Sequence, residues 1–404
     1  MIAIIAWRNV WRNKGRSLVV IGAMVIGIWA MAFGGGFMKS FLISYISSSI
    51  RHETSNGQIH HPEFTKDYDI KFGIQNAGAV ISYLEDRPEV EAVTARSLIN
   101  GMISSSRQAT GVKIIGVNPD EEAKVTELND LVGDGTYFDG ISSNPVLIGE
   151  KLAEKLKVGV KSKVVLTFQD REGNITAGRF RVAGLLHASS VAINETSAFV
   201  LKTDLNRLLG LQQEVHEIAY TTVTETDDEL LSKEIQKEFP NEKVESWKEL
   251  SPVLVFMEQY MASILKILIV IIMSALAFGI INTMLMAVLE RVRELGMLMA
   301  LGMKRGKVFL MIMVETIYLS TVGGPLGLLI GYITIAYLGK SGIDLTDYSE
   351  GLEAIGYDSV LYPVLQAGDY VEIVIGVLLT AILASIYPAW KAIKLRPIDA
   401  LHTI

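Results

Sequence analysis

The residues whose types could carry catalytic or metal chemistry fall in three short stretches. They are the histidine pair at 60–61, His216-Glu217, which begins like a zinc-binding helix motif, and Gly339-Lys340-Ser341, which ends like a phosphate-binding loop. The zinc motif requires a second histidine where Tyr220 stands, and the phosphate loop requires a glycine where Thr334 stands. The chain has no cysteine, which excludes thiolate metal sites and cysteine nucleophiles. The sequence therefore predicts no enzyme active site, no metal site and no cofactor bound by this chain.

The elements that would position any functional residue are mostly apolar helices. Half of the 404 residues are hydrophobic, only 20% are charged, and the mean hydropathy is +0.35, which is typical of a membrane protein. A net charge of -7 gives no basic field for gripping nucleic acid. Four uncharged stretches are each long enough for a helix to cross a hydrocarbon core of ~30 Å. They are residues 17–38, 267–289, 316–339 and 373–390.

The charges between these stretches predict the orientation. The segment before the first stretch, the loop between the second and third, and the segment after the fourth are short and rich in Lys and Arg. By the positive-inside rule all three lie in the cytoplasm. Residues 48–256 hold 22 Lys and Arg against 32 Asp and Glu, and we expect them on the opposite side.

The predicted fold is four transmembrane α-helices with a large mixed α/β extracytoplasmic domain inserted between helices one and two. We place a cytoplasmic amphipathic helix at 1–16, transmembrane helices at 17–47, 257–289, 308–339 and 373–390, the α/β domain at 48–256, a cytoplasmic loop at 290–307, a short outer loop at 340–372 and a cytoplasmic tail at 391–404.

The first 16 residues predict a helix that lies along the membrane surface. Trp7 and Trp11 recur at helical spacing on an apolar face, while Arg8 and Arg12 take other faces. Indole rings at headgroup depth and flanking arginines are typical of interfacial helices. The apolar run that follows is longer than the core of a secretory signal, so we interpret it as an uncleaved first membrane helix.

The inserted domain shows mixed periodicity. Alternating β-rich runs at 163–168 and 179–185 flank a turn and predict a hairpin, while 145–156 and 203–211 predict helices. Ser251-Pro252 predicts the start of a helix that continues to about residue 290. Such a helix is ~58 Å long at 1.5 Å per residue, so we expect it to project from the membrane as a stalk.

The loop at 290–307 has the most distinctive pattern. It reads ERVRELGMLMALGMKRGK, with leucines every three residues among small residues. A short helix of this kind can dock in a groove of a partner protein, or simply lie at the membrane interface. The spacing alone favours neither alternative, and Arg291 and Arg293 could serve only as topology anchors.

The same loop resembles the "ER-x-E-G-x-x-A-L-G" loop of the MacB/FtsX/LolC-LolE superfamily of ABC transporter permeases. Three further phrases of the sequence are similar to that superfamily: AWRNVWRNKGRS near the start, VLIGEKLAEKLKVG in the inserted domain, and YPAWKAIKLRPIDAL near the end. The order of these phrases and the four-helix layout also match. The phrase GQIHHPEFTKDYD after the first helix resembles the start of the LolC/LolE outer domain.

The resemblance implies a permease subunit without an ATP site, in the inner membrane of a bacterium, with both termini cytoplasmic and the large domain periplasmic. Its partners would be a dimer of a cytoplasmic ATPase that binds ATP and Mg, a second permease subunit, identical or homologous, membrane lipid, and a periplasmic carrier or adaptor. The residues expected to couple to the ATPase are Glu290, Arg291, Arg293, Glu294, Gly296, Leu298, Ala300, Leu301 and Gly302.

The outer part of the first helix contains three successive glycines, which let a neighbouring backbone or an acyl chain approach closely. A candidate path for substrate or an acyl chain comprises Phe33, Gly34, Gly35, Gly36, Phe37 and Met261. A packing seam between helices is the alternative interpretation of the glycines. Glu315, the acid well inside a membrane segment, is expected to face a protein interior or to reach back to the cytoplasmic surface.

Three functions fit the resemblance. The first is extraction of lipoproteins from the outer leaflet of the inner membrane and their transfer to a periplasmic carrier. The alternatives are a MacB-type efflux permease for peptides or drugs and an FtsX-like signalling permease that controls a cell-wall hydrolase. A membrane-tethered hydrolase or sensor without an ATPase is a fourth hypothesis, of a different class.

Overall fold

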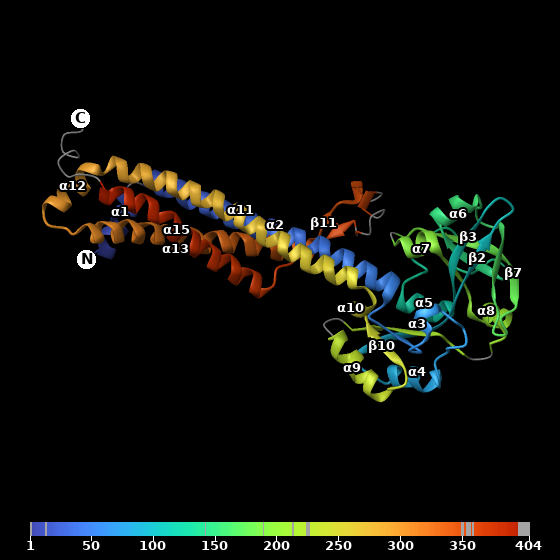
Figure 1. Ribbon diagram of the computed structural model, residues 1–404. Helices are drawn as coiled ribbons and strands as arrows, with labels where there is room; N and C mark the ends of the chain where they lie inside the picture. Colours follow the sequence, from blue (N-terminus) through green and yellow to red (C-terminus); the bar gives the residue numbers. More distant parts are fainter. Residues whose placement is uncertain are drawn as a thin grey trace. The chain divides into compact units, whose positions relative to one another are not determined.

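The computed structural model describes residues 2–12, 14–141, 143–188, 190–211, 214–223, 227–348, 351–352, 357 and 359–394 (Figure 1). The chain forms two compact units. The helical unit comprises Met1–Leu42, Glu258–Asp344 and Val360–Ile404, and the α/β unit comprises Ile43–Met257 and Leu345–Ser359. The part of the expected cytoplasmic tail from residue 395 onward lies outside the described residues.

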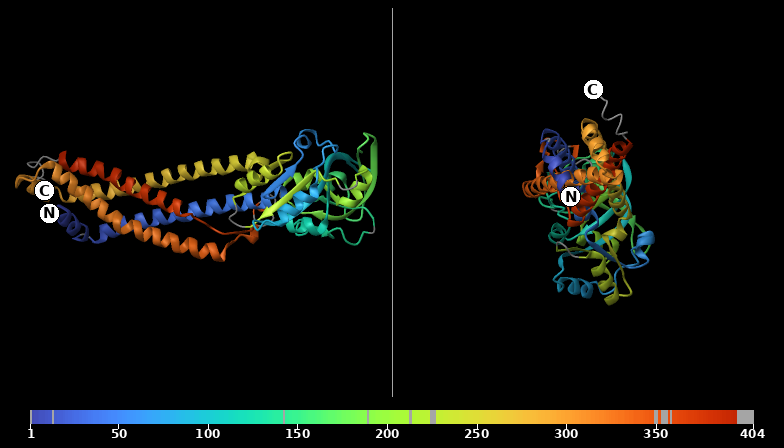
Figure 2. Two further views of the ribbon diagram at one scale, coloured as in Figure 1. Left: turned by 90° about the horizontal axis from the view of Figure 1, so that it is seen from below. Right: turned by 90° about the vertical axis from the view of Figure 1, so that its left-hand side faces the viewer.

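Long helices make up the helical unit (Figures 1 and 2). The elements that contribute to it are α1 (Ile2–Arg12), α2 (Lys14–Ser49), α11 (Pro252–Glu290), α12 (Val292–Ala300), α13 (Arg305–Ser341), strands β11 (Ile343–Asp344) and β12 (Val360–Leu361), and α15 (Ala367–Lys394). Four of them, α2, α11, α13 and α15, are long and apolar enough to cross a membrane. The prediction of four transmembrane helices is confirmed.

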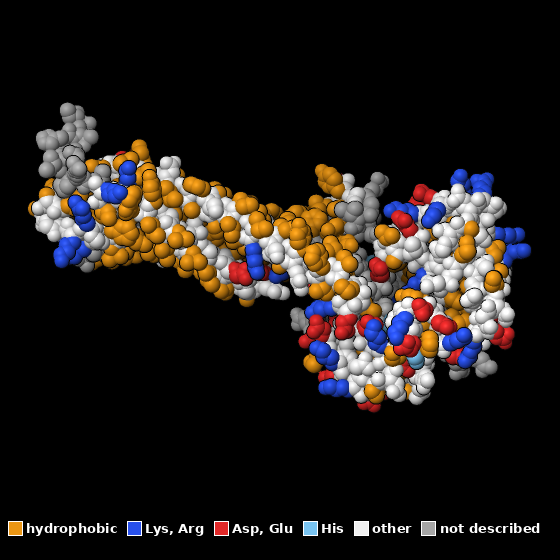
Figure 3. Space-filling view, viewed as in Figure 1, with side chains coloured by type: hydrophobic (Ala, Val, Ile, Leu, Met, Phe, Trp, Pro, Cys, Tyr) orange, Lys and Arg blue, Asp and Glu red, His pale blue; other side chains and the backbone are white. Residues whose placement is uncertain are grey.

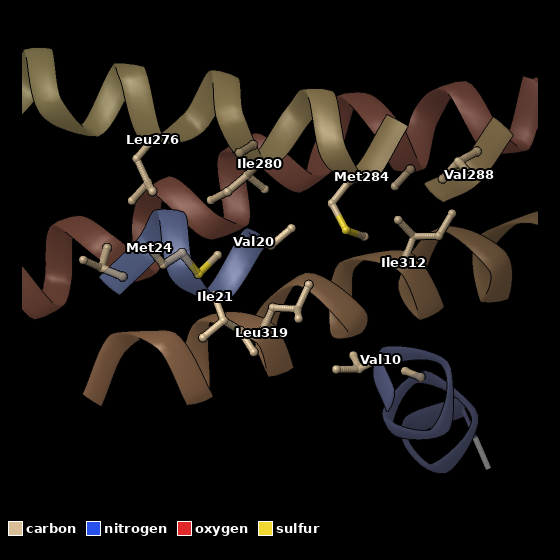
Figure 4. Close-up of a cluster of buried hydrophobic side chains, with 14 of the residues drawn as sticks. Val10, Val20, Ile21, Met24, Leu276, Ile280, Met284, Val288, Ile312 and Leu319 are labelled. Atoms are coloured by element: carbon tan, nitrogen blue, oxygen red, sulfur yellow. The ribbon is translucent and has the colours of Figure 1, made fainter. Parts of the chain in front are cut away.

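The core of the helical unit is formed by aliphatic and methionine side chains from all of its long helices and from α1 (Figure 4). The outer surface of this unit carries mostly apolar side chains, as expected for helices in lipid (Figure 3). A soluble bundle would instead alternate apolar and charged faces.

Glycines let α13 pack closely against α2. A Cβ atom on Gly323 would lie 3.1 Å from the Cβ of Met24, and one on Gly327 would lie 2.9 Å from the Cβ of Ile28. Both separations are tighter than an ordinary contact, so a side chain at either position would require neighbouring atoms to shift. Small residues at helix contacts are the usual means by which membrane helices associate, and we refer to this contact as the glycine seam.

The α/β unit includes the last residues of α2, from Ile43, and the π-helical turn η1 (Ile50–Thr54), which extends α2. Its strands are β1 (Gly57–His60), β2 (Val90–Ser104), β3 (Ala109–Val117), β4 (Val132–Gly135), β5 (Pro145–Gly149), β6 (Lys163–Gln169), β7 (Ile175–Leu186), β8 (Ser197–Leu201), β9 (Glu217–Thr222) and β10 (Lys243–Ser246). Its helices are α3 (Phe64–Asp67), α4 (Ala77–Glu85), α5 (Pro119–Val125), α6 (Glu150–Leu156), α7 (Val191–Thr196), α8 (Lys202–Leu209), α9 (Asp228–Glu238), α10 (Trp247–Leu250) and the 3-10 turn η2 (Thr346–Tyr348).

One long strand joins the two halves of the sheet. The strand order is β10-β1-β9-β2-β3-β8-β5-β7-β4, and β6 pairs with both β2 and β7. The first part of β2 pairs with β9 and its second part, from Ser97, pairs with β3. Each half has its own apolar core, so β2 is the element that the two halves share.

The predicted hairpin is present as β6 and β7, and the predicted helix at 203–211 is present as α8. The prediction of a helix over 145–156 was wrong for its first five residues, which form β5. All five are buried, and β5 pairs with β7 on one side and β8 on the other. A fully buried strand is apolar at every position and has no period of two, so the sequence pattern resembles that of a buried helix.

A network of buried charges lies where β2 passes from one half to the other. The Arg96 guanidinium donates to both oxygens of Glu122, at 2.9 and 2.7 Å, and to Glu217 Oε1 at 2.6 Å. All three residues are at least 95% buried. Burial opposes ionisation of Glu217, but the charge of Arg96 prevails and lowers its pKa to about 2.

Candidate functional site around α12

The loop predicted to couple to an ATPase contains a short helix, α12. It is separated from α11 by Arg291, whose backbone (φ -105°, ψ 15°) breaks the helix. It ends in a Schellman motif, in which the N–H of Gly302 donates to Met299 O and the N–H of Met303 donates to Leu298 O. Gly302 has φ +96°, a conformation that favours glycine. Its local role is therefore to terminate α12.

The faces of α12 differ in exposure. Arg291, Leu295 and Gly296 are buried against the helical unit, while Leu298 is half-buried. The exposed positions in and just after α12 are Arg293, Glu294, Met297, Ala300, Leu301 and Gly302. Leu301 is 80% exposed, an unusual environment for leucine. A partner can therefore reach these exposed positions, which we call the exposed rim, but not the buried Gly296. The predicted coupling role of all these residues stays a prediction.

Two groups of residues that were predicted separately meet at this site. Arg12 Nη2 at the end of α1 lies 2.5 Å from Glu294 Oε2 on α12. Arg16 in the first turn of α2 pairs with Glu290 at the end of α11. The side chains of the first pair are about half exposed, so this contact contributes at most ~1 kcal/mol. The first pair joins α12 to α1, and the second joins α11 to α2.

A third ion pair is buried beneath the other two. Arg291 Nη1 donates to Glu315 Oε1 on α13 at 3.1 Å, and Nη2 donates to Asn9 O on α1 at 3.1 Å. Asn9 O is one of the last four carbonyls of α1, which have no partner within their own helix. Glu315 therefore faces the protein interior, and it does not reach back to the cytoplasmic surface. Arg291 is not a simple surface anchor.

A cavity of about 380 Å³ lies beside this buried pair. Its wall includes Met284, Val288, Leu298 and Ile312, together with Arg291 and Glu315. The Nε of Arg291 is buried and has no hydrogen-bond partner among the residues that the structure describes. The charged pair is therefore bordered by open space as well as by packed side chains, so α12 has room to shift relative to α11 and α13.

The N-terminal helix packs on α13. Its inner face buries Ala6 and Val10, and the Trp7 ring contacts Tyr318 of α13 edge-on, with centroids 5.3 Å apart. Trp7 and Trp11 are 44% and 40% exposed, and Arg8 is also exposed. A packed apolar face and exposed indoles fit an interfacial helix, whose position at the membrane surface stays a prediction.

The candidate acyl-chain path is only partly explained by packing. Gly36 is buried, and a Cβ there would lie 2.6 Å from Ile335 of α13, so it belongs to a helix contact. Added Cβ atoms at Gly34 and Gly35 would meet nothing within 4 Å. Phe33 and Phe37 stack with centroids 6.0 Å apart. Met261 is half-buried on α11, and the path that would join it to these rings stays a prediction.

Two protein families match the chain over most of its length. Residues 17–238 match the MacB-like periplasmic core domain, and residues 266–397 match the FtsX-like permease C-terminal family. The first match covers more than half of the chain. The second includes all of the α12 region.

The chain is also similar to individual proteins and to a solved structure. The lipoprotein-releasing system transmembrane protein LolC of Neisseria meningitidis is 24% identical over 340 residues, which are 80% of each chain. The macrolide export ATP-binding/permease protein MacB of Syntrophobacter fumaroxidans is 30% identical over 125 residues, which are 31% of this chain and 15% of that one. The crystal structure of the periplasmic region of MacB from Actinobacillus actinomycetemcomitans is 14% identical, covers 54% of this chain and 97% of that one, and has a TM-score of 0.35.

Proposed function

Because the chain belongs to the family of ABC transporter permeases with a MacB-like periplasmic core domain and an FtsX-like C-terminal region, we propose that it transmits the ATP-driven motion of a separate cytoplasmic ATPase to its α/β unit. The α12 region supports this proposal. Its exposed rim offers apolar and charged contacts to a partner, and its base is tied by ion pairs to α1, α2 and α13.

The charge distribution supports an orientation with both termini and α12 in the cytoplasm of a bacterium and the α/β unit in the periplasm. The basic segments at the start of the chain and after α12 lie on the side that the positive-inside rule assigns to the cytoplasm. We further propose that two permease subunits, identical or homologous, assemble with two ATPase subunits that hold ATP and Mg.

The most specific proposal concerns the cargo: we propose that the complex extracts lipoproteins from the outer leaflet of the inner membrane and passes them to a periplasmic carrier. The single observation that supports it is the match to LolC, which runs over 80% of both chains instead of one shared region.

A release assay tests this proposal. The complex of the chain and its ATPase would be reconstituted in proteoliposomes with a fluorescent triacylated lipoprotein, and the lipoprotein released to a soluble carrier would be measured with and without ATP. The matched control is the same lipoprotein without its acyl chains but with a membrane anchor helix. We expect ATP-dependent release of the acylated form only. Equal release of both forms, or of neither, would contradict the proposed cargo.

Efflux of peptides or drugs is the second candidate. The observation that favours it is the 30% identity to a macrolide exporter over 125 residues, higher than the identity to LolC although over a shorter segment. ATP-dependent movement of soluble peptides across the vesicle boundary, without release of acylated protein, would favour this function over lipoprotein release.

A further inference from the structure

We propose that the buried pair of Arg291 and Glu315 is a latch that transfers the movement of α12 to α13, and that both residues are positioning residues for transport. This inference rests on the proposed function, because it assumes that a partner moves α12. Neither the exposed rim of α12 nor its surface ion pairs explain how the movement of α12 is transmitted to the other helices.

The first observation is the place of Arg291 in the chain. It is the residue between α11 and α12, and its backbone lies outside the helical conformation. A rotation of α12 about its junction with α11 must therefore occur at Arg291. The side chain of the same residue is 92% buried and cannot follow the rotation through solvent. Any such rotation must displace what the guanidinium binds.

The second observation is what the guanidinium binds. It contacts Glu315 Oε1 on α13 and Asn9 O on α1, each at 3.1 Å, so one side chain ties three elements. The C-terminal end of α1 carries a partial negative charge from its aligned peptide dipoles, which also attracts the cation. The outer pair of Arg12 and Glu294 is half exposed and is screened by solvent. Of these two pairs, the buried one is thus the less screened by solvent.

The third observation is the space around the pair. The adjacent cavity and the unpartnered Nε of Arg291 leave the guanidinium free to move with α12 without first displacing packed side chains. Glu315, in contrast, lies on α13, whose glycine seam packs tightly against α2. A displacement of Glu315 therefore moves α13 together with α2, the helix whose chain continues into the α/β unit.

The experiment uses the full chain in complex with its ATPase, in lipid nanodiscs. The chain contains no cysteine, so a single Tyr337→Cys change, at a position 71% exposed near the far end of α13, can be spin-labelled selectively. The measurement is the change in label mobility when ATP and vanadate are added. It is made on the otherwise unchanged chain, on Glu315→Gln, and on Glu372→Gln, an exposed acid of α15 that serves as the matched control.

We expect Glu315→Gln to retain the ATPase in the purified complex but to lose at least half of the nucleotide-dependent change in label mobility, while Glu372→Gln behaves like the unchanged chain. The exchanged variant Arg291→Glu/Glu315→Arg, which restores an ion pair but not the contact with Asn9, should recover part of the change. It also keeps the test decisive if the single variant folds poorly.

Three results would overturn the latch. An unaltered label response in Glu315→Gln would show that α13 moves without the pair. Loss of the bound ATPase from Glu315→Gln would show that the pair only shapes the docking surface. No recovery in the exchanged variant would show that the two residues do not act through each other. If label mobility does not change with nucleotide even in the unchanged chain, the proposed function itself is overturned, and the latch with it.

Discussion

Replacing Arg96 with methionine removes the cation that two buried carboxylates share in the α/β unit. The effect can be estimated from Glu217, whose pKa is about 2 in the folded chain against an ordinary value of 4.5. A difference of this size corresponds to about 3 kcal/mol of stability near neutral pH. That figure agrees with the 3–5 kcal/mol usually lost, roughly, when one partner of a buried ion pair is removed.

Hydrogen exchange of the full chain in nanodiscs measures this loss locally. Arg96 lies on the part of β2 that pairs with β9, so we expect the amides of these two strands to exchange about 100-fold faster in Arg96→Met. The matched control is Arg207→Met, because Arg207 is 63% exposed and pairs with Asp204 at the surface. Equal exchange of β2 and β9 in the two variants would refute the argument.

The same network predicts a pH dependence. A carboxyl whose folded pKa lies below its unfolded value stabilises the fold above the unfolded value, and that stability is lost as the pH falls. For Glu217 the loss should begin near pH 4.5 and continue toward pH 2. Exchange rates corrected for intrinsic pH effects should therefore rise over this range in the unchanged chain. In Arg96→Met/Glu217→Gln the contribution should be absent.

Two further changes test the helical unit. Leu298→Asp should weaken copurification of the ATPase at least tenfold, because it places a charge on the half-buried edge of α12. The control Leu298→Met should copurify normally. A normal complex with the aspartate variant would contradict the assignment of α12 as the docking helix. Gly327→Leu should destabilise the unit by roughly 1–3 kcal/mol, because its Cβ would crowd Ile28 across the glycine seam. The control is Gly279→Leu, at an exposed position of α11 where an added Cβ would meet nothing described within 4 Å, and equal melting temperatures of the two variants would refute the seam.

The membrane helices could be predicted from the sequence because the requirement is local. A helix in lipid needs about 20 apolar residues in succession, and this pattern is visible in any one stretch of chain. The start of α11 at Pro252 was predicted for a similar reason, since proline at the first helical position is a local signal.

The partners of charged residues could not be predicted, because they depend on contacts far apart in the sequence. The predicted loop and the predicted interfacial helix were recognised separately, but Arg12 and Glu294 are 282 positions apart and only the fold joins them. Arg96 and Glu122 were not singled out, and Glu217 was considered only as part of a zinc-binding motif that the sequence does not complete. Each looks like an ordinary surface charge in its own segment, and only the assembled sheet buries them together.

The strand β5 shows a different limit. Its five residues are apolar at every position, and periodicity cannot distinguish such a strand from the first turns of a buried helix. The flanking sequence favoured a helix because the helix α6 follows directly at Glu150. The distinction is made by the strands on both sides, β7 and β8, which lie later in the chain.

On the proposed function, nucleotide events on a separate ATPase reach the α/β unit of this chain. The most direct measurement places a fluorophore on a single Val191→Cys change, at a site 62% exposed in that unit, and follows its emission in the reconstituted complex. We expect the emission to change on addition of ATP and vanadate, and we expect this change to disappear when the ATPase is omitted or when Leu298→Asp is present. Emission that stays constant with nucleotide in the intact, ATP-hydrolysing complex would contradict it.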